Sequence, residues 1–154
     1  MPSLYAYRKV IDTVTTHTLR LPEATQGGQA GHELATLADG RTVVVLFDAY
    51  SLPTEQPSPI AASVELLPTA LPDLLREQIK ASSPHVALIS QRMIDQIRAN
   101  YTQDDENYFS RIGVGAAMGM YAPSSDEIQA MTVFGEFVEA VRQWGRAERA
   151  KLGL

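Results

Sequence analysis

The sequence predicts an α+β protein, with an N-terminal β-strand and hairpin region followed by a C-terminal bundle of three to four α-helices. Two observations carry this prediction. Residues 1–68 are rich in Val, Ile, Thr and Tyr, which fit the pleated surface of a strand. Residues 69–154 have apolar side chains at helical spacing, separated by prolines and capping residues. Strands and helices that are segregated in this way favour α+β over an alternating α/β sheet.

The first strand is predicted to be long. The β-branched and aromatic residues of positions 5–21 continue until Pro22, which ends the strand. Neither face is fully apolar, and no nearby strand has the same length, so backbone groups would stay unpaired. We therefore expect residues 5–21 to contact another protein or another copy of the chain, with Tyr5 and Tyr7 among the contacting residues.

A hairpin should follow the first strand. Residues 23–33 contain three glycines and predict a flexible loop. Asp39 and Gly40 predict a two-residue turn, in which both positions take a positive φ. Residues 42–47 form a continuous apolar run, so the strand after the turn should be the most buried one.

A proline-rich segment marks the end of the β-rich region. Residues 51–59 hold three prolines and predict an extended linker or an edge segment, because proline neither donates to a ladder nor continues a helix. Residues 60–68 can return as one more strand. We place the boundary between a β-rich region, residues 1–68, and a helical domain, residues 69–154, after Pro68.

Two helices are predicted directly after this boundary. The first presents an apolar face at helical spacing, which consists of Leu71, Leu74, Leu75 and Ile79. The second begins at Ser83, which suits the N-cap, and Pro84, which suits the first helical position because its missing N–H costs nothing there.

Two further helices should each begin with a capping box. Thr102 with Asp105 and Ser124 with Glu127 have the required spacing, with Asp105 in place of the usual Glu. The third helix should continue as far as Pro123. The fourth, residues 125–151, would be about 40 Å long, with a glycine after it for the C-terminal stop.

Composition narrows the function classes. The 154 residues suffice for one domain with a core, or for two small subdomains. A net charge of −5 argues against a nucleic-acid-binding protein, and the basic C-terminal residues are interleaved with Glu139 and Glu148. The absence of cysteine excludes disulfides, thiolate catalysis and cysteine-ligated zinc. No run of about 18 apolar residues predicts a membrane span, and the N-terminus shows no secretory signal.

Gly113, Gly115 and Gly119 raise the question of a phosphate-binding loop. Their spacing departs from the dinucleotide fingerprint, no strand precedes them, and the Lys-Ser/Thr end of a P-loop is missing. Gly115 and Gly119 are instead predicted to form a strip, one helical turn apart, against which another helix packs closely. Local unwinding at Gly113 is the alternative. No cofactor is expected.

No polar cluster has a recognisable catalytic pattern, so we expect no enzymatic activity and no metal. The acidic residues 104–106 suit the first turn of a helix, where the dipole favours negative charge, and a cation site is the alternative. The three histidines lack ligand spacing. Trp144 should pack in the core or, alternatively, anchor an interface. A small enzyme is the rival hypothesis, with these candidate residues: His17, His32, Asp48 and His85.

The order of the segments resembles a known group of proteins. A hairpin around "LADGRTVVVLF" leads into the proline-rich "LPTEQPSPIAASVELLP", then "SPHVALISQRMIDQIR", and the chain closes with "FVEAVRQWGRAERAKLGL". This layout resembles small proteins encoded in the tail modules of tailed bacteriophages and prophages. The resemblance carries no functional residue over to this chain.

The resemblance implies a non-enzymatic structural protein of the phage tail that acts through protein contacts. Its partners would be other tail or virion proteins or copies of itself, so that a homo-oligomer is expected. It would be found in the virion, or in the host cytoplasm during assembly. The alternative within the same setting is a tail assembly chaperone or adaptor that is absent from the final particle.

Overall fold

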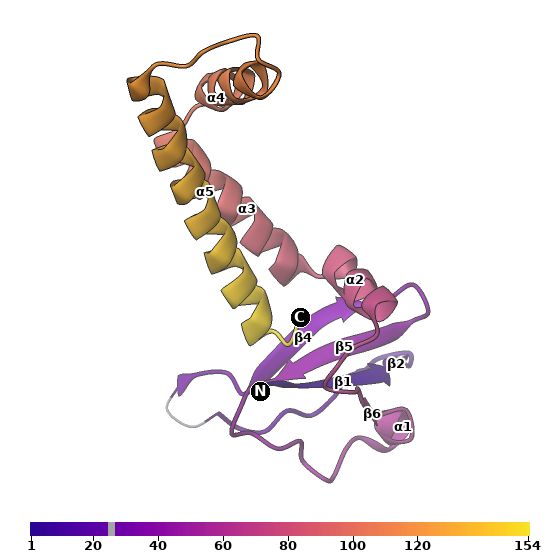
Figure 1. Cartoon of the computed structure of the whole chain (residues 1–154). Helices are drawn as coiled ribbons and strands as arrows, with labels where there is room; N and C mark the ends of the chain where they lie inside the picture. Colours follow the sequence, from indigo (N-terminus) through magenta and orange to yellow (C-terminus); the bar gives the residue numbers. More distant parts are fainter. Residues whose placement is uncertain (25–26) are drawn as a thin grey trace. The chain divides into compact units, whose positions relative to one another are not determined.

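The computed structural model describes residues 1–24 and 27–154, and it confirms the α+β class (Figure 1). The strands are β1 (Ser3–Arg8), β2 (Val10–Ile11), β3 (Thr16–His17), β4 (Gly31–Thr36), β5 (Arg41–Leu46) and β6 (Glu65–Leu66). The helices are α1 (Ser58–Ala61), α2 (Asp73–Ser82), α3 (Pro84–Asn100), α4 (Gln103–Ala117) and α5 (Ser125–Lys151). The chain divides into two compact units, which we name the sheet unit (residues 1–88 and 148–154) and the helical unit (residues 89–147).

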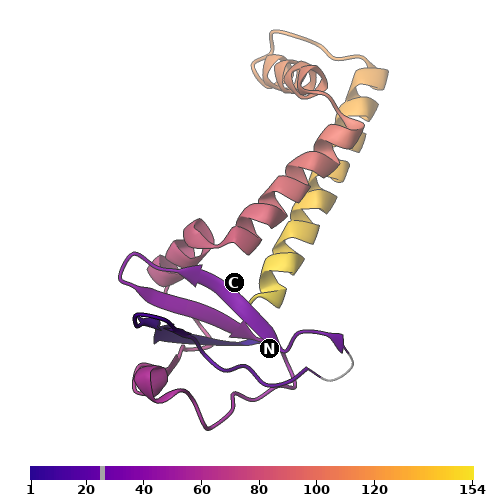
Figure 2. The same cartoon turned by 180° about the vertical axis from the view of Figure 1, so that it is seen from behind.

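The sheet unit contains four antiparallel strands in the order β4-β5-β1-β6. β4, β5 and β1 lie side by side in both views of the molecule (Figure 1, Figure 2). β5 therefore has a neighbour on each edge, and its residues 42–46 are all buried. This confirms the prediction that the strand after the hairpin turn is the most buried, because a continuous apolar run can be covered on both faces.

The prediction of one long strand over residues 5–21 is wrong. β1 ends at Arg8, and the chain then turns back so that β2 pairs with β3. Asp12 makes this turn, because its Oδ1 accepts the backbone N–H groups of Val14 at 3.1 Å and Thr15 at 2.9 Å. An Asp side chain commonly replaces backbone partners in this way. β1 itself pairs with β5 and β6, so no excess strand length calls for a second chain.

The hairpin between β4 and β5 also differs from the prediction. Its connection spans residues 37–40, and only Gly40 takes a positive φ, at 82°. Asp39 instead accepts the Arg41 N–H at 2.9 Å and pairs with the Arg41 guanidinium at 2.7 Å. The prediction of a two-residue turn is thus wrong, although the predicted hairpin is present.

Gly31 belongs to β4 rather than to the expected glycine-rich loop. A Cβ at this position would overlap the carbonyl oxygen of Val45 in β5. The residue is therefore needed for the close approach of two strands. Thr25 and Gln26, which belong to the same predicted loop, lie outside the described residues.

The compact units do not follow the expected boundary after Pro68. α2 packs against β4, so the sheet unit continues through α2 and into the first residues of α3. Within the predicted apolar face of α2, Ile79 is fully buried whereas Leu74 is 74% exposed. The proline-rich segment contains the short helix α1, and β6 follows it as the expected additional strand.

Both predicted capping boxes are confirmed. Thr102 Oγ1 accepts the Asp105 N–H at 3.1 Å, and the Asp105 carboxylate accepts the Thr102 N–H at 2.7 Å. Ser124 Oγ accepts the Glu127 N–H at 3.2 Å, and the Glu127 carboxylate accepts the Ser124 N–H at 2.8 Å. Each pair satisfies backbone donors that a helix start leaves free. Gly153 ends α5 as expected, with a φ of 77°.

The helical unit is held together by an aromatic cluster. Tyr101 meets Phe134 edge-on with ring centroids 4.9 Å apart, and Phe109 stacks on Phe134 at 5.0 Å. α3 and α5 approach each other closely at Gly145, where a Cβ would overlap the Met93 sulfur. Gly145 is buried, so this is a tight contact between two helices within the unit.

Candidate functional site

The helical unit exposes a large share of its apolar side chains. Three aliphatic residues of this unit are buried: Ile89, Ile112 and Val141. Its exposed large hydrophobic residues are Ile94, Tyr108, Val114, Met118, Met120, Tyr121, Ile128 and Val133. Exposed apolar side chains are informative when they gather in one place. Four of these residues lie in the second half of α4 and the segment that follows it: Val114, Met118, Met120 and Tyr121.

A groove of about 650 Å³ runs along α4. It is lined by Asn107, Ser110, Arg111, Val114, Gly115, Met118 and Met120. At 3.6 residues per turn, positions 107, 111, 114 and 118 fall within an arc of roughly 60° on the helix surface. The groove is therefore a straight stripe on the face of α4 opposite to its aromatic contacts. Val114 is 59% exposed and Met118 is 62% exposed, so the apolar end of the stripe lies open.

A second hollow, of about 360 Å³, adjoins the groove. It is lined by Tyr108, Arg111, Ile112 and Tyr121, so Arg111 belongs to both hollows. Arg111 makes no hydrogen bond or ion pair with any residue that the structure describes. The guanidinium is always charged, and it stands here between phenol rings on one side and aliphatic side chains on the other.

The walls of this second hollow are fixed by one carboxylate. Glu127 accepts hydrogen bonds from Tyr108 Oη at 3.0 Å and from Tyr121 Oη at 2.8 Å. The Ser124 N–H first, and then the hydroxyl groups of Tyr121 and Tyr108, lower the pKa of Glu127. The carboxylate in turn raises the pKa of both tyrosines. The network connects α4, the connecting segment and the start of α5, and so it positions the side chains that border Arg111.

The predicted glycine strip on α4 is wrong in its geometry. α4 ends at Ala117, and Gly119 lies beyond it with a φ of 68°. The Gly119 N–H donates to Ala116 at 3.1 Å, and the Met120 N–H donates to Gly115 at 2.9 Å, which is the hydrogen-bond pattern of a Schellman C-cap. Gly115 faces this turn, because a Cβ there would lie 3.1 Å from Tyr121 Cβ.

Close helix packing therefore occurs at a different glycine. Gly145 meets Met93 between α5 and α3, whereas Gly115 and Gly119 shape the turn at the end of α4. Whether Gly115 and Gly119 also contact a partner stays a prediction. The backbone turn that they make places Met120 and Tyr121 beside α4, and this is how the two glycines contribute to the groove.

The tyrosines predicted to contact a partner lie in the sheet unit. Tyr7 is only 1% exposed and packs in a core cluster with Leu19, Val44 and Ile60. Burial raises the pKa of its phenol. Tyr7 is therefore a core residue, which corrects its assignment as a contact residue. Tyr5 is partly buried against the same cluster, and Trp144 is half-buried on α5.

The structure brings together two of the four residues considered for a small enzyme. The rings of His32 and His85 stack with centroids 4.1 Å apart, and His85 Nε2 lies 3.1 Å from the Glu33 carbonyl oxygen. Burial, and then the charge of His85, lower the pKa of His32, whose buried Nε2 has no hydrogen-bond partner among the described residues.

The other two candidates lie elsewhere in separate pairs. His17 Nε2 lies 3.0 Å from an Asp12 carboxylate oxygen, and Asp48 forms an ion pair of 2.8 Å with the amino group of Met1. Over residues 1–24 and 27–154, no group of three His, Asp or Glu residues is arranged to hold a metal ion. Asp105, one of the acidic residues considered for a cation, is occupied by its capping box.

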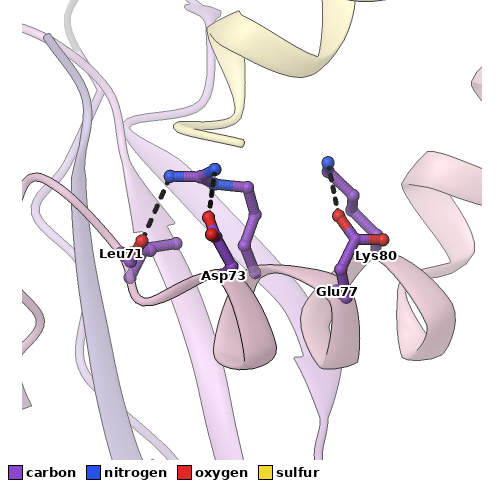
Figure 3. Close-up of polar contacts among 5 residues, drawn as sticks. Leu71, Asp73, Glu77 and Lys80 are labelled. Atoms are coloured by element: carbon purple, nitrogen blue, oxygen red, sulfur yellow. Dashed lines mark hydrogen bonds and ion pairs between the residues drawn. The ribbon is translucent and has the colours of Figure 1, made fainter.

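The sheet unit has a hollow of its own, of about 530 Å³, which Arg76 and Lys80 border together with Leu4 and Leu67. Figure 3 shows why these two bases offer little charge to a ligand. The guanidinium of Arg76 binds Asp73 at 3.2 Å and the Leu71 carbonyl at 3.1 Å, and Lys80 binds Glu77 at 3.0 Å (Figure 3). Each base thus has an acidic partner on its own helix. The groove on α4, with its unpaired arginine, is the stronger candidate site.

Part of the groove was readable from the sequence. Val114 and Met118 are four residues apart, and at helical spacing they lie away from the face that Phe109 and Ile112 share. Arg111 was not singled out, because nothing in the sequence says which arginine lacks an acidic neighbour in space.

Comparison with known proteins identifies no relative of this chain. A search against protein-family models, curated proteins and solved structures finds no match for the chain. None of the helices among the described residues has the length and apolar character that crossing a membrane requires. The surface of the helical unit is therefore the feature of the molecule that bears on its function.

Proposed function

We propose that this protein is a non-enzymatic interaction protein, and that its helical unit holds a partner protein through the groove on α4. The observation that carries the proposal is the combination of exposed apolar side chains and an unpaired arginine along one helix face. Protein interfaces combine an apolar centre with aromatic, methionine and arginine residues in this way. Arg111, Met118 and Met120 of the groove, together with Tyr121 of the adjoining hollow, have this composition.

The biological setting that we propose is the tail of a tailed bacteriophage. The resemblance of the segment order to small tail-module proteins supports this setting. In this setting the chain would be a tail-associated virion component that contacts other tail proteins or copies of itself. The alternative is an assembly chaperone or adaptor that leaves before the particle is complete.

Mass spectrometry of purified particles tests the setting. The organism that carries the gene is induced or infected, and both the particles and the lysate of assembling cells are analysed for peptides of this chain. Peptides in the particles at a fixed ratio to other tail proteins support the virion component. Peptides that occur only in assembly complexes support the chaperone, and peptides in neither fraction contradict both.

A further inference from the structure

We propose that the groove on α4 binds a segment that carries a carboxylate next to an apolar side chain, as an acidic amphipathic helix or strand does. The proposal rests on the proposed function and specifies its partner. The carboxylate would meet Arg111, and the apolar side chain would lie on Val114, Met118 and Met120. The partner is a different protein rather than a second copy of this chain.

The charge of Arg111 argues for the carboxylate. Two arginines of the helical unit have acidic partners: Arg98 pairs with Glu106 at 2.8 Å, and Arg146 pairs with Glu139. Arg111 has no such partner among the described residues, yet it borders two hollows. A guanidinium presents its donors in a planar fork that matches a carboxylate, and apolar walls strengthen the pair by excluding water.

The chemistry of the walls argues for the apolar side chain. Met120 is 77% exposed, and it continues the open surface of Val114 and Met118. Methionine side chains are flexible and polarizable, and they adapt to partners of different shape. The tyrosines on the other side of Arg111 are held by Glu127, so one wall is rigid and the other adaptable. A segment with a single acid and one or two apolar side chains fits both.

Geometry argues against a second copy. The acid on the same face of α4 is Asp104, seven residues before Arg111. In an antiparallel two-fold contact, Asp104 would meet Arg111 of the copy only if the axis passed between Asn107 and Tyr108. With a rise of 1.5 Å per residue, Val114 would then lie about 10 Å from the axis along the helix. The first residue of the copy's α4 would lie only about 7 Å from the axis on that side, so the copy's helix would end before it reached Val114. Such a dimer would satisfy the charges and leave the apolar wall uncovered.

Peptide selection tests the proposal without knowledge of the natural partner. The full chain is used to select binders from an mRNA-display library of random 15-residue peptides. The affinity of the best binders is then measured by fluorescence anisotropy. We expect enriched peptides to contain Asp or Glu within four residues of Leu, Met, Phe or Ile. We also expect Arg111→Gln to weaken their binding at least tenfold.

A charge cycle and a matched control make the test specific. Replacing the peptide's acid by its amide should weaken binding to the wild type by the same factor, and should have no further effect on Arg111→Gln. Arg92→Gln removes another exposed arginine of the helical unit that makes no hydrogen bond or ion pair with any described residue, and it should bind like the wild type. Binders that lack an acid, or that bind Arg111→Gln as tightly as the wild type, would overturn the proposal.

Sedimentation velocity over a range of concentrations tests the rival occupant. Without peptide, we expect the wild type and Arg111→Gln to have the same association state at every concentration. A dimer that this substitution dissociates would make the second copy the occupant and overturn the proposed partner chemistry. Such a dimer would leave the proposed function intact, because the chain could still be found in particles or assembly complexes. Absence of the chain from both would contradict the proposed function, whatever the peptide experiment shows.

Discussion

The sheet unit and the helical unit differ in where their apolar side chains lie. In the sheet unit, buried side chains from β1, β4, β5, α1 and α2 form a core in which Leu34, Val43, Val45 and Ile60 have no exposed surface. In the helical unit, the large apolar side chains that are buried are those of Ile89, Ile112 and Val141. The large apolar side chains that this unit exposes outnumber them. A difference of this kind indicates that one unit is stabilised by its own core and that the other keeps apolar surface available for contacts.

The difference has a simple geometric origin. A four-stranded sheet with a helix packed on it covers the apolar face of its central strands, as β5 shows. A few helices joined end to end cover one stripe of each helix and leave the other faces open. The aromatic cluster around Phe134 provides the contact stripe, and the groove side of α4 is then the face without a partner.

The largest expected effect comes from emptying the core of the sheet unit. Leu34→Ala removes a fully buried side chain and should lower the free energy of unfolding by about 2–5 kcal/mol. Leu74→Ala is the matched control, because the same change occurs at a side chain that is 74% exposed, and it should cost less than about 0.5 kcal/mol. Urea unfolding followed by circular dichroism measures both. Equal losses would contradict the contrast between the buried and the exposed leucine.

Two glycines on α5 sharpen the comparison within the helical unit. Alanine is favoured over glycine in a helix by about 1 kcal/mol, and this gain is common to Gly135→Ala and Gly145→Ala. A Cβ at Gly135 meets nothing within 4 Å, whereas a Cβ at Gly145 overlaps the Met93 side chain. Gly145→Ala should therefore be less stable than Gly135→Ala by about 1 kcal/mol or less, because the overlapping atoms belong to the flexible end of the Met93 side chain and can shift.

Thermal unfolding of the two glycine variants side by side provides the measurement. Gly135→Ala should melt above the wild type. Gly145→Ala should melt below Gly135→Ala, and the additional substitution Met93→Ala should recover part of the loss because it removes the overlapping atoms. Identical melting temperatures for the two single variants would show that α3 and α5 are not in close contact at this point.

A smaller effect is expected from the histidine pair of the sheet unit. The pKa of His32 is lowered from 6.5 by burial and by His85, so the native state favours the neutral ring. The unfolded chain then binds more protons than the native state in the window below pH 6.5 and above the folded-state pKa. The free energy of unfolding therefore has its full value above pH 6.5 and decreases as the pH falls through that window.

His32→Phe should flatten this dependence. The ring of His32 packs edge-on against Phe47 and stacks on His85, and its buried Nε2 has no described partner, so an apolar ring of similar shape suits the site. Urea midpoints at pH 7.5 and pH 5.5 should differ less for the variant than for the wild type. A wild-type midpoint that does not change over this range would show that His32 titrates as it does in the unfolded chain.

Local interactions account for the parts of the fold that were predictable from the sequence. The capping boxes at Thr102 and Ser124 each depend on two residues at a fixed spacing, and both are present. The buried strand was evident from one apolar run. The break after Arg8 was missed, because the Thr-rich sequence has strand character throughout and the turn depends on bonds that Asp12 makes through its side chain and its backbone N–H.

The candidate site was less predictable because it depends on which side chains lack a partner in the folded chain. Helical spacing places Phe109 and Ile112 on one face of α4, and Val114 and Met118 lie outside that face. That Arg111 lacks an acidic partner follows only from the arrangement of all the charged side chains. The end of α4 at Ala117 was also missed, since the Schellman turn at Gly119 precedes the expected stop at Pro123.

The smallest expected effect on stability is at the groove itself. Met118→Ser and Met120→Ser replace exposed side chains, so each should change the free energy of unfolding by less than about 0.5 kcal/mol. Val141→Ser, at a side chain that is 5% exposed in the same unit, should be clearly destabilising. If Met118 were covered within the chain, Met118→Ser would instead melt several degrees lower and the groove would belong to the core of its own unit. Unchanged melting together with weaker peptide binding is the result that assigns this surface to a partner.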